Sequence, residues 1–235
     1  MSATRASEVL AKLERLGKKA VRDAYAPRYG IVAKQALGVS MAVLQKVAKG
    51  LGTDHALALS LWTTGCFEAR MLATLIDDPA QVTAAQMERW CKDFDNWAIC
   101  DTACFKLFDR TPHAFGKVVA WSKRKPEFEK RAAYALLASL ALHDKHSSDD
   151  AFLRHLPRIA AAADDARNFV KKGVSWALRS IGTRSAALHA AARALAKRLA
   201  SSEDPAPRWV GKDVLRDLSR PLVTKRIAAK AKRRE

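Results

Sequence analysis

The spacing of the apolar residues most constrains how this chain folds, because they recur every three to four positions in segment after segment. In the first such segment, residues 6–25, an apolar stripe runs through Val9, Leu13, Leu16 and Val21. That spacing is typical of helices packed on one face, and no stretch alternates as a strand does. A composition of 49% hydrophobic residues with 10 glycines and 8 prolines also suits helices. The sequence therefore predicts an all-α protein.

Caps and helix breakers divide the chain into many short helices. We expect Ser40 and Thr53 to be N-caps, and Thr83 with Gln86 to form a capping box. The predicted helices, by residue number, are 6–25, 31–37, 41–49, 54–62, 66–76, 84–91, 94–105, 112–121, 126–140, 149–163, 168–181, 185–199 and 208–218.

Short connections between such helices require neighbours to pack antiparallel in pairs. Stacked pairs form a right-handed α-solenoid of the HEAT-like or armadillo-like kind, with a concave face suited to a long ligand such as DNA. No strict repeat is visible, so this prediction depends on the helix spacing alone. We expect one folded domain over residues 1–220. Residues 221–235 have few apolar residues and are expected to fray into a basic tail.

Positive charge is concentrated in the second half of the chain. The net charge is +18; residues 1–120 hold 16 Lys and Arg against 12 Asp and Glu, whereas residues 121–235 hold 26 against 12. Such an excess favours nucleic-acid binding through counterion release. A merely solvated basic face is the alternative. A membrane surface fits less well, because no amphipathic segment carries an aromatic apolar face.

Several classes of protein fit the sequence poorly. No apolar window is long enough to cross a bilayer, and the N-terminus leads into a charged helix rather than a signal peptide, so we expect a cytoplasmic protein, at the nucleoid in a bacterium. The four cysteines, Cys66, Cys91, Cys100 and Cys104, lack the spacing of a metal site. We expect buried reduced thiols, no metal and no cofactor.

The segment 94–105 contains an acid that its apolar surroundings do not explain. Helical spacing puts Trp97 and Asp101 one turn apart on one face. An indole beside a carboxylate forms an apolar wall with a fixed negative charge, which suits a cationic guest. The structural alternative is an aspartate that caps a turn or pairs with a lysine, and a tryptophan that belongs to the core.

A later segment places a tryptophan among cations. Lys172, Trp176 and Arg179 share a helix face, and Lys171 precedes them. Such a tryptophan offers a stacking surface beside phosphates. Arg131 begins an otherwise apolar helix near its buried side. A half-buried tryptophan and a surface arginine are the structural alternatives.

These motifs together resemble the HEAT-like-repeat DNA alkylation repair proteins, the glycosylases related to bacterial alkylpurine glycosylase D. The resemblance extends from Tyr29-Gly30 through the stretches 57–62 and 67–70 to 176–179, nearly the whole folded chain.

The resemblance implies roles for particular residues. Asp101 matches the catalytic aspartate, and Trp97 and Trp176 match tryptophans that flank the damaged nucleotide. Arg131 matches an arginine at the DNA backbone, with Arg179 and Tyr29 at further DNA-facing positions. Ser40 departs from the pattern, because glutamine is common there, which puts that DNA contact in doubt.

The implied activity is hydrolysis of the N-glycosidic bond of cationic N3- or N7-alkylpurines, such as 3-methyladenine and 7-methylguanine, in double-stranded DNA, by a monomer and without deep base flipping. A carboxylate would stabilise the oxocarbenium-like sugar that develops. One alternative is a non-catalytic binder of damaged or branched DNA, although such relatives tend to lack the aspartate or the tryptophans. Another is a scaffold for protein partners, which the uniform positive charge disfavours.

Overall fold

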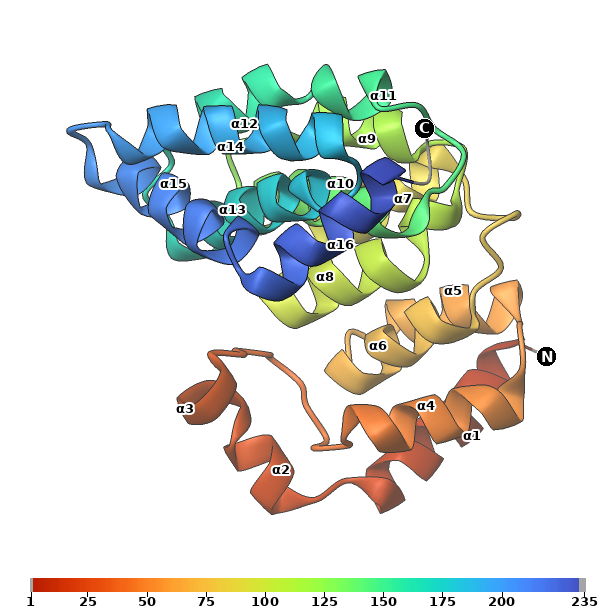
Figure 1. The fold of residues 1–235 in the computed structure, drawn as a ribbon. Helices are drawn as coiled ribbons and strands as arrows, with labels where there is room; N and C mark the ends of the chain where they lie inside the picture. The colour runs from red at the N-terminus through yellow and green to blue at the C-terminus, as the bar shows by residue number, and fades with distance from the viewer. Residues whose placement is uncertain (1, 233–235) are drawn as a thin grey trace. The chain divides into compact units, whose positions relative to one another are not determined.

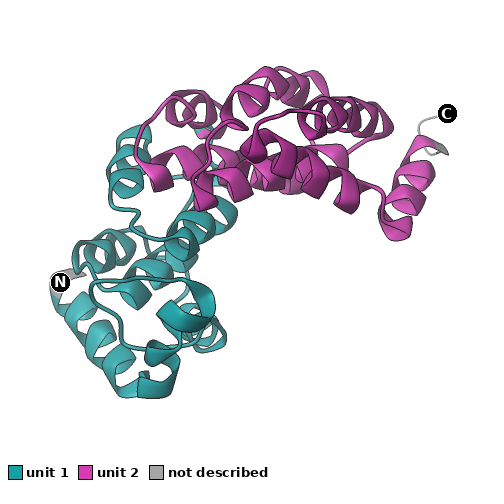
Figure 2. Cartoon of the chain, turned by 90° about the vertical axis from the view of Figure 1, so that its left-hand side faces the viewer, with its two compact units in different colours: residues 1–113 teal, residues 114–235 magenta. Residues whose placement is uncertain are grey.

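The computed structural model of the protein describes residues 2–232, and every regular element among them is a helix (Figure 1). The chain divides into two compact units, residues 1–113 and 114–235 (Figure 2). No helix in the described part of the chain is both long and apolar enough to cross a membrane.

The first unit contains eight α-helices and a short 3-10 helix within its described residues. They are α1 (Ser2–Leu16), α2 (Lys19–Asp23), α3 (Tyr25–Tyr29), α4 (Met41–Leu51), α5 (His55–Thr63), α6 (Phe67–Ile76), α7 (Ala84–Lys92), α8 (Trp97–Lys106) and η1 (Phe108–Arg110). Helices α5 and α6 pack together, with α1 against α5, and both α4 and α8 against α6.

The second unit contains eight α-helices in the range that the structure describes. They are α9 (Ala114–Trp121), α10 (Glu127–His143), α11 (Asp150–Leu153), α12 (Leu156–Ala162), α13 (Asn168–Gly182), α14 (Ala186–Ala200), α15 (Pro205–Leu218) and α16 (Pro221–Lys232). Helices α10 and α13 pack along their lengths, and α14 packs on α15.

Stacked tryptophans form the aromatic core of the first unit. The buried rings of Trp62 and Trp90 lie parallel with their centroids 3.8 Å apart. The indole nitrogen of Trp62 donates to Asp93 Oδ2 at 2.8 Å, so its polar atom is satisfied at the edge of the core. This contact fixes α5 against the end of α7.

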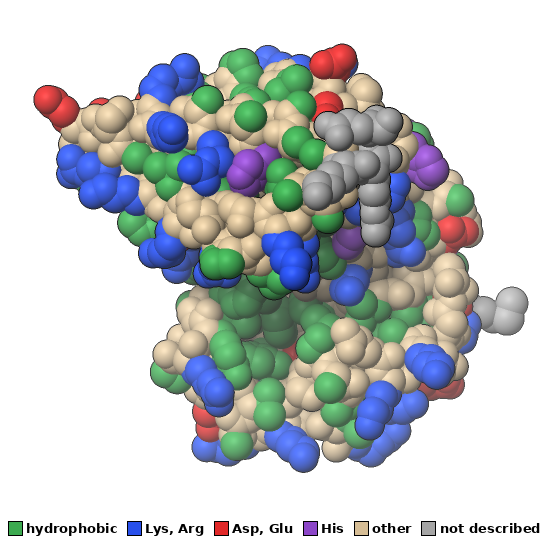
Figure 3. All heavy atoms as spheres, viewed as in Figure 1, with side chains coloured by type: hydrophobic (Ala, Val, Ile, Leu, Met, Phe, Trp, Pro, Cys, Tyr) green, Lys and Arg blue, Asp and Glu red, His purple; other side chains and the backbone are tan. Residues whose placement is uncertain are grey.

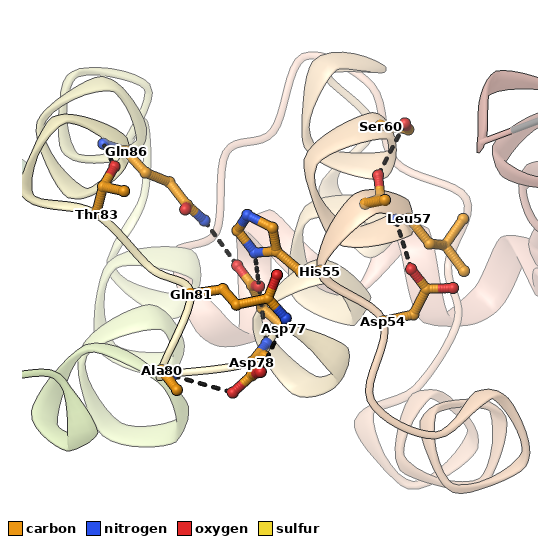
Figure 4. A network of polar contacts seen from close by, with 11 residues as sticks. Asp54, His55, Leu57, Ser60, Asp77, Asp78, Ala80, Gln81, Thr83 and Gln86 are labelled. Carbon is orange, nitrogen blue, oxygen red and sulfur yellow. Dashed lines mark hydrogen bonds and ion pairs between the residues drawn. The ribbon is translucent and has the colours of Figure 1, made fainter.

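A buried carboxylate also joins α5, α6 and α7 (Figure 4). Asp77 Oδ1 lies 2.6 Å from His55 Nδ1 and accepts from the amide of Asp78, while Oδ2 accepts from Gln86 Nε2 at 2.7 Å. The predicted capping box is therefore only half formed, because Thr83 Oγ1 accepts from the Gln86 amide but the Gln86 side chain binds Asp77.

The predicted helix over residues 31–37 is wrong. The buried carboxylate of Glu68, on α6, accepts from the amides of Leu37, Gly38 and Val39 at 2.9, 2.6 and 3.2 Å, and from Tyr25 Oη at 2.9 Å. Because their amides bind Glu68, residues 37–39 belong to an irregular segment that connects α3 to α4. The φ angle of Gly38 is +83°, and a Cβ there would lie 2.3 Å from the Lys18 carbonyl oxygen.

Other helix boundaries and caps also differ from prediction. The predicted helix 6–25 ends at Leu16, where the Lys18 amide turns to the Gly38 carbonyl oxygen at 3.0 Å. Asp54, not Thr53, caps α5, because its side chain accepts from the Leu57 amide. The predicted helix 149–163 is two helices, since Pro157 starts α12 in its first turn. The helices predicted from 112 and 208 begin at Ala114 and Pro205.

The expected fraying of the C-terminal segment is also wrong within its described residues, because 221–232 form α16. This helix packs on α14 and α15, with Ile227 buried. Lys230 Nζ donates to the carbonyl oxygens of Thr183 and Arg184 at 2.7 and 3.2 Å. Residues 233–235 of the predicted tail lie outside the described residues.

We predict that His155 makes the second unit less stable in acid. Burial, and then the charges of Arg158 and Arg154, lower the pKa of this imidazole from 6.5 to about 4. Between pH 6.5 and pH 4 His155 is protonated in the unfolded chain but not in the folded one. Its contribution to the free energy of unfolding is therefore complete above pH 6.5 and is lost as the pH falls towards 4. The full loss is about 3 to 4 kcal/mol, at about 1.4 kcal/mol per pKa unit.

The measurement is urea unfolding at pH 7 and pH 4.5, compared with His155→Phe. The variant keeps an aromatic ring against Phe115, whose ring stacks on the imidazole at 5.9 Å, but it cannot titrate. We expect the free energy of unfolding to fall less in the variant. An identical fall in both proteins would contradict the prediction.

Candidate active site

Helix α8 presents Trp97 and Asp101 on its partly exposed face. Asn96 caps the helix, with its buried side chain accepting from the amides of Ala98 and Ile99 at 3.0 and 3.2 Å. Trp97 is the first residue of α8 and Asp101 follows one turn later. The opposite face is the apolar core side, where the buried residues are Ile99, Cys100, Ala103 and Cys104. The helix is therefore anchored on one side and open on the other.

The indole of Trp97 also holds the end of α3. Its Nε1 donates to the carbonyl oxygen of Tyr29 at 2.9 Å. Helix α3 ends there because Gly30 adopts the left-handed conformation, with φ at 62°, and its amide returns to the Ala26 carbonyl. Tyr29 is 46% exposed, and the guanidinium carbon of Arg28 lies over its ring, 5.3 Å from the centre.

A pocket of about 330 Å³ lies within the first unit, beside α8. Four predicted site residues meet there: Tyr29, Ser40, Trp97 and Asp101. The other lining residues are uncharged and mainly apolar; they are Val21, Tyr25, Ile31, Val39, Met41, Leu44, Phe67, Met71, Ala98 and Thr102. Among the residues that line this pocket, all of them described, Asp101 is the one charged side chain.

Two titratable groups near Asp101, Tyr25 and Cys104, remain neutral at physiological pH. Burial, and then Glu68, raise the pKa of the Tyr25 phenol above its usual value. Burial also raises the pKa of the Cys104 thiol on the core side of α8. The pocket therefore combines aromatic walls with a single negative charge, an arrangement that favours a cationic guest over a neutral one.

The cysteines are all free and buried, as predicted. Within residues 2–232, no three His, Cys, Asp or Glu side chains are grouped so as to hold a metal ion.

Arg131, the predicted phosphate contact, lies in the second unit and is only 6% exposed. Its Nη1 donates to the carbonyl oxygen of Phe169 at 2.6 Å, which ties the start of α10 to the start of α13. Part of its hydrogen-bonding capacity thus serves the fold.

Helix α13 carries the other predicted DNA-facing residues. Lys172 is exposed, whereas Lys171, Trp176 and Arg179 are partly exposed. Arg179 faces two carboxylates of α15, with Nε 3.7 Å from Asp213 Oδ2 and Nη1 3.9 Å from Asp217 Oδ1.

One aromatic residue that the sequence reading missed lies beside this helix. Trp209, on α15, is 36% exposed, and Lys171 Nζ lies 4.8 Å from the centre of its ring. The sequence does contain a signal for Trp209, because Arg208 and Lys212 flank it in the same way that cations flank Trp176.

The structure thus brings Tyr29, Ser40, Trp97 and Asp101 together in the first unit. The remaining predicted site residues belong to the second unit; they are Arg131, Lys171, Lys172, Trp176 and Arg179.

The fold and the pocket define an α-helical repeat protein with an anionic aromatic site. The chain belongs to the DNA alkylation repair enzyme family, whose model matches residues 9–216. No curated protein matches the sequence.

The chain has the same fold as a solved structure. That structure is of a protein from what is described as a new family related to the HEAT-like repeat DNA glycosylases, with affinity for branched DNA structures. It is 19% identical in sequence and aligns with a TM-score of 0.75 over 89% of this chain and 94% of that one. The predicted all-α, HEAT-like fold is confirmed.

We predict that Glu68→Gln destabilises the first unit. Its amide keeps the shape of the side chain, but the negative charge is lost and an NH₂ group replaces one of the oxygens that face the amides of residues 37–39. Because hydrogen bonds to a charged group contribute about 1.5 to 3 kcal/mol each, we expect a loss of about 2 to 4 kcal/mol in the free energy of unfolding.

Urea unfolding of the variant checks this prediction, with Glu14→Gln as the control because Glu14 is an exposed carboxylate of α1. The control should differ from the wild type by less than about 0.5 kcal/mol. Equal stability of the two variants would rule out the role assigned to Glu68.

Proposed function

We propose that this protein is a DNA glycosylase that excises cationic N3- and N7-alkylpurines from double-stranded DNA and leaves an abasic site. The observation that carries this proposal is the pocket beside α8, whose aromatic and apolar walls contain the lone carboxylate of Asp101. Membership of the DNA alkylation repair enzyme family supports it.

Cleavage of the glycosidic bond of a cationic purine requires few catalytic groups besides a carboxylate. An alkylated purine is already cationic, so it leaves as a neutral base when the bond to C1′ breaks and takes the bonding electrons. Positive charge then develops on the sugar, where a carboxylate stabilises the transition state more than the ground state. Water adds to C1′, and its proton passes to Asp101 or to solvent.

Trp97 and Tyr29 contribute the aromatic surface. An indole or phenol face attracts a cation by about 0.5 to 2 kcal/mol, which favours an alkylated purine over an undamaged one. The hydrogen bond from Trp97 to the Tyr29 carbonyl holds one ring at a fixed position. We propose that Trp176 supplies a further aromatic contact at the lesion.

The cations of the second unit suit binding along the DNA backbone. Residues 121–235 carry 26 Lys and Arg against 12 Asp and Glu. Lys and Arg side chains are spread over the face shown in Figure 3. We propose that Arg131, Arg179, Lys171 and Lys172 contact phosphates, and that Ser40 lies near the DNA beside the pocket.

The test is release of 7-methylguanine from a duplex under single-turnover conditions. Asp101→Asn should slow release by about a hundredfold to a thousandfold, the usual cost of removing a group that stabilises transition-state charge, while DNA affinity stays nearly unchanged. Glu14→Gln, which removes one exposed carboxylate from the same unit, should retain full activity.

Two results would contradict this proposal. One is release by the Asp101→Asn variant at the wild-type rate. The other is a wild-type rate no faster than spontaneous loss for 7-methylguanine, 3-methyladenine and a bulky cationic adduct alike.

A second candidate function is binding of branched DNA without cleavage. It is favoured by the similar structure described as having affinity for branched DNA structures. Under this candidate, a four-way junction should bind more tightly than a linear duplex of equal length and charge, and Asp101→Asn should leave that preference intact. Equal affinity for both DNA forms would rule it out.

A further inference from the structure

A second cavity, of about 370 Å³, lies entirely within the second unit. It is formed by α9, by α11 and α12, and by the loop that precedes α11. Its apolar walls include Phe115, Val119 and Ala151. A volume of this size is typical of sites for small organic ligands.

Two arginines line this cavity: Arg154, just after the end of α11, and Arg158, on α12. Arg154 Nε donates to the Asp150 carbonyl oxygen, and Arg158 Nη1 donates to the Arg154 carbonyl oxygen, both at 3.1 Å. These bonds leave several guanidinium N–H groups for another acceptor. No carboxylate lines the cavity, and neither arginine has an ion pair with any described residue. The positive charge of the cavity is therefore uncompensated.

His155 lies between these arginines in sequence and also lines the cavity. It is 1% exposed, and its Nδ1 has no hydrogen-bond partner among the described residues. A buried polar atom without a partner is costly unless something binds it. Its ring stacks on Phe115 with an interplanar angle of 15°, so the imidazole continues an aromatic wall.

Gly116 is an exposed glycine that lines this cavity. It lies inside α9, where glycine is unfavourable relative to alanine. Nothing lies within 4 Å of the position that its Cβ would occupy, so packing does not require a glycine. Because Gly116 lines the cavity, a side chain there would reduce its volume.

We propose that this cavity binds a nucleotide, with the phosphate held by Arg154 and Arg158 and the base against the aromatic wall of Phe115 and His155. Two guanidinium groups match the geometry of a phosphate. A flat base suits walls that are aromatic and apolar. The nucleotide can be free or the 5′-phosphorylated end of a DNA strand. This site shares no lining residue with the Asp101 pocket, so the nucleotide proposal does not depend on the glycosylase proposal.

The experiment is isothermal titration calorimetry of the full chain with deoxyguanosine 5′-monophosphate at low salt. We expect saturable 1:1 binding. Gly116→Leu should weaken it at least tenfold because the side chain enters the cavity, without lowering the melting temperature, since leucine favours the helix. Arg158→Gln should weaken it about tenfold to a hundredfold through loss of charged hydrogen bonds.

The matched control is Lys197→Gln, which removes an exposed positive charge from α14 outside the cavity and should bind as the wild type does. Deoxyguanosine, which lacks the phosphate, should bind at least tenfold more weakly. A 5′-phosphorylated oligonucleotide that competes better than its 5′-hydroxyl counterpart would assign the site to a strand end. Absence of such competition would assign it to the free nucleotide.

The proposal is overturned if the wild type shows no saturable binding of deoxyguanosine 5′-monophosphate or of the phosphorylated strand. It is also overturned if deoxyguanosine binds equally well. Binding that survives both Gly116→Leu and Arg158→Gln would place any nucleotide elsewhere on the chain.

Discussion

The carboxylate of Glu68 determines the path of the chain between α3 and α4, and the pocket depends on that path. Three consecutive amides and the Tyr25 hydroxyl donate to it, so a segment with little regular structure is fixed in place. Val39 and Ser40, at the end of this segment, then line the pocket. The Trp97 indole fixes the other wall by its bond to Tyr29. The buried and part-buried hydrogen bonds to Glu68, and the exposed one from Trp97 to Tyr29, thus position a site that hydrophobic packing alone would leave loose.

We propose that this construction gives the negative charge of Asp101 its selectivity for a cationic ligand. A carboxylate in water distinguishes weakly between charged and neutral ligands, because solvent screens it. Here the Tyr25 phenol and the Cys104 thiol stay neutral, because their pKa values are raised. One charge among aromatic and apolar side chains therefore matches a substrate whose own positive charge moves from the base to the sugar during the reaction. The proposed activity needs no metal or cofactor in this pocket.

The helices and the Trp97/Asp101 face could be predicted because both follow from spacing along the chain. Residues 168–181 and 185–199, for example, match α13 and α14 closely. The segment 31–37 could not, since the group that binds the neighbouring amides, Glu68, is about thirty residues away in the sequence. The family resemblance implied that Arg131 contacts DNA, but its bond to the Phe169 carbonyl is a tertiary contact that spacing does not reveal. Docking of α16 through Ile227 and Lys230 escaped prediction for the same reason.

The most direct test of the central claim compares the affinity of the protein for two abasic-site analogues in one duplex. One carries a pyrrolidine, whose protonated nitrogen mimics the cationic sugar, and the other carries a neutral tetrahydrofuran. If Asp101 recognises positive charge, the wild type should bind the pyrrolidine duplex at least tenfold more tightly, and Asp101→Asn should lose that preference. Equal affinity of the wild type for both analogues, or an undiminished preference in the variant, would contradict the account.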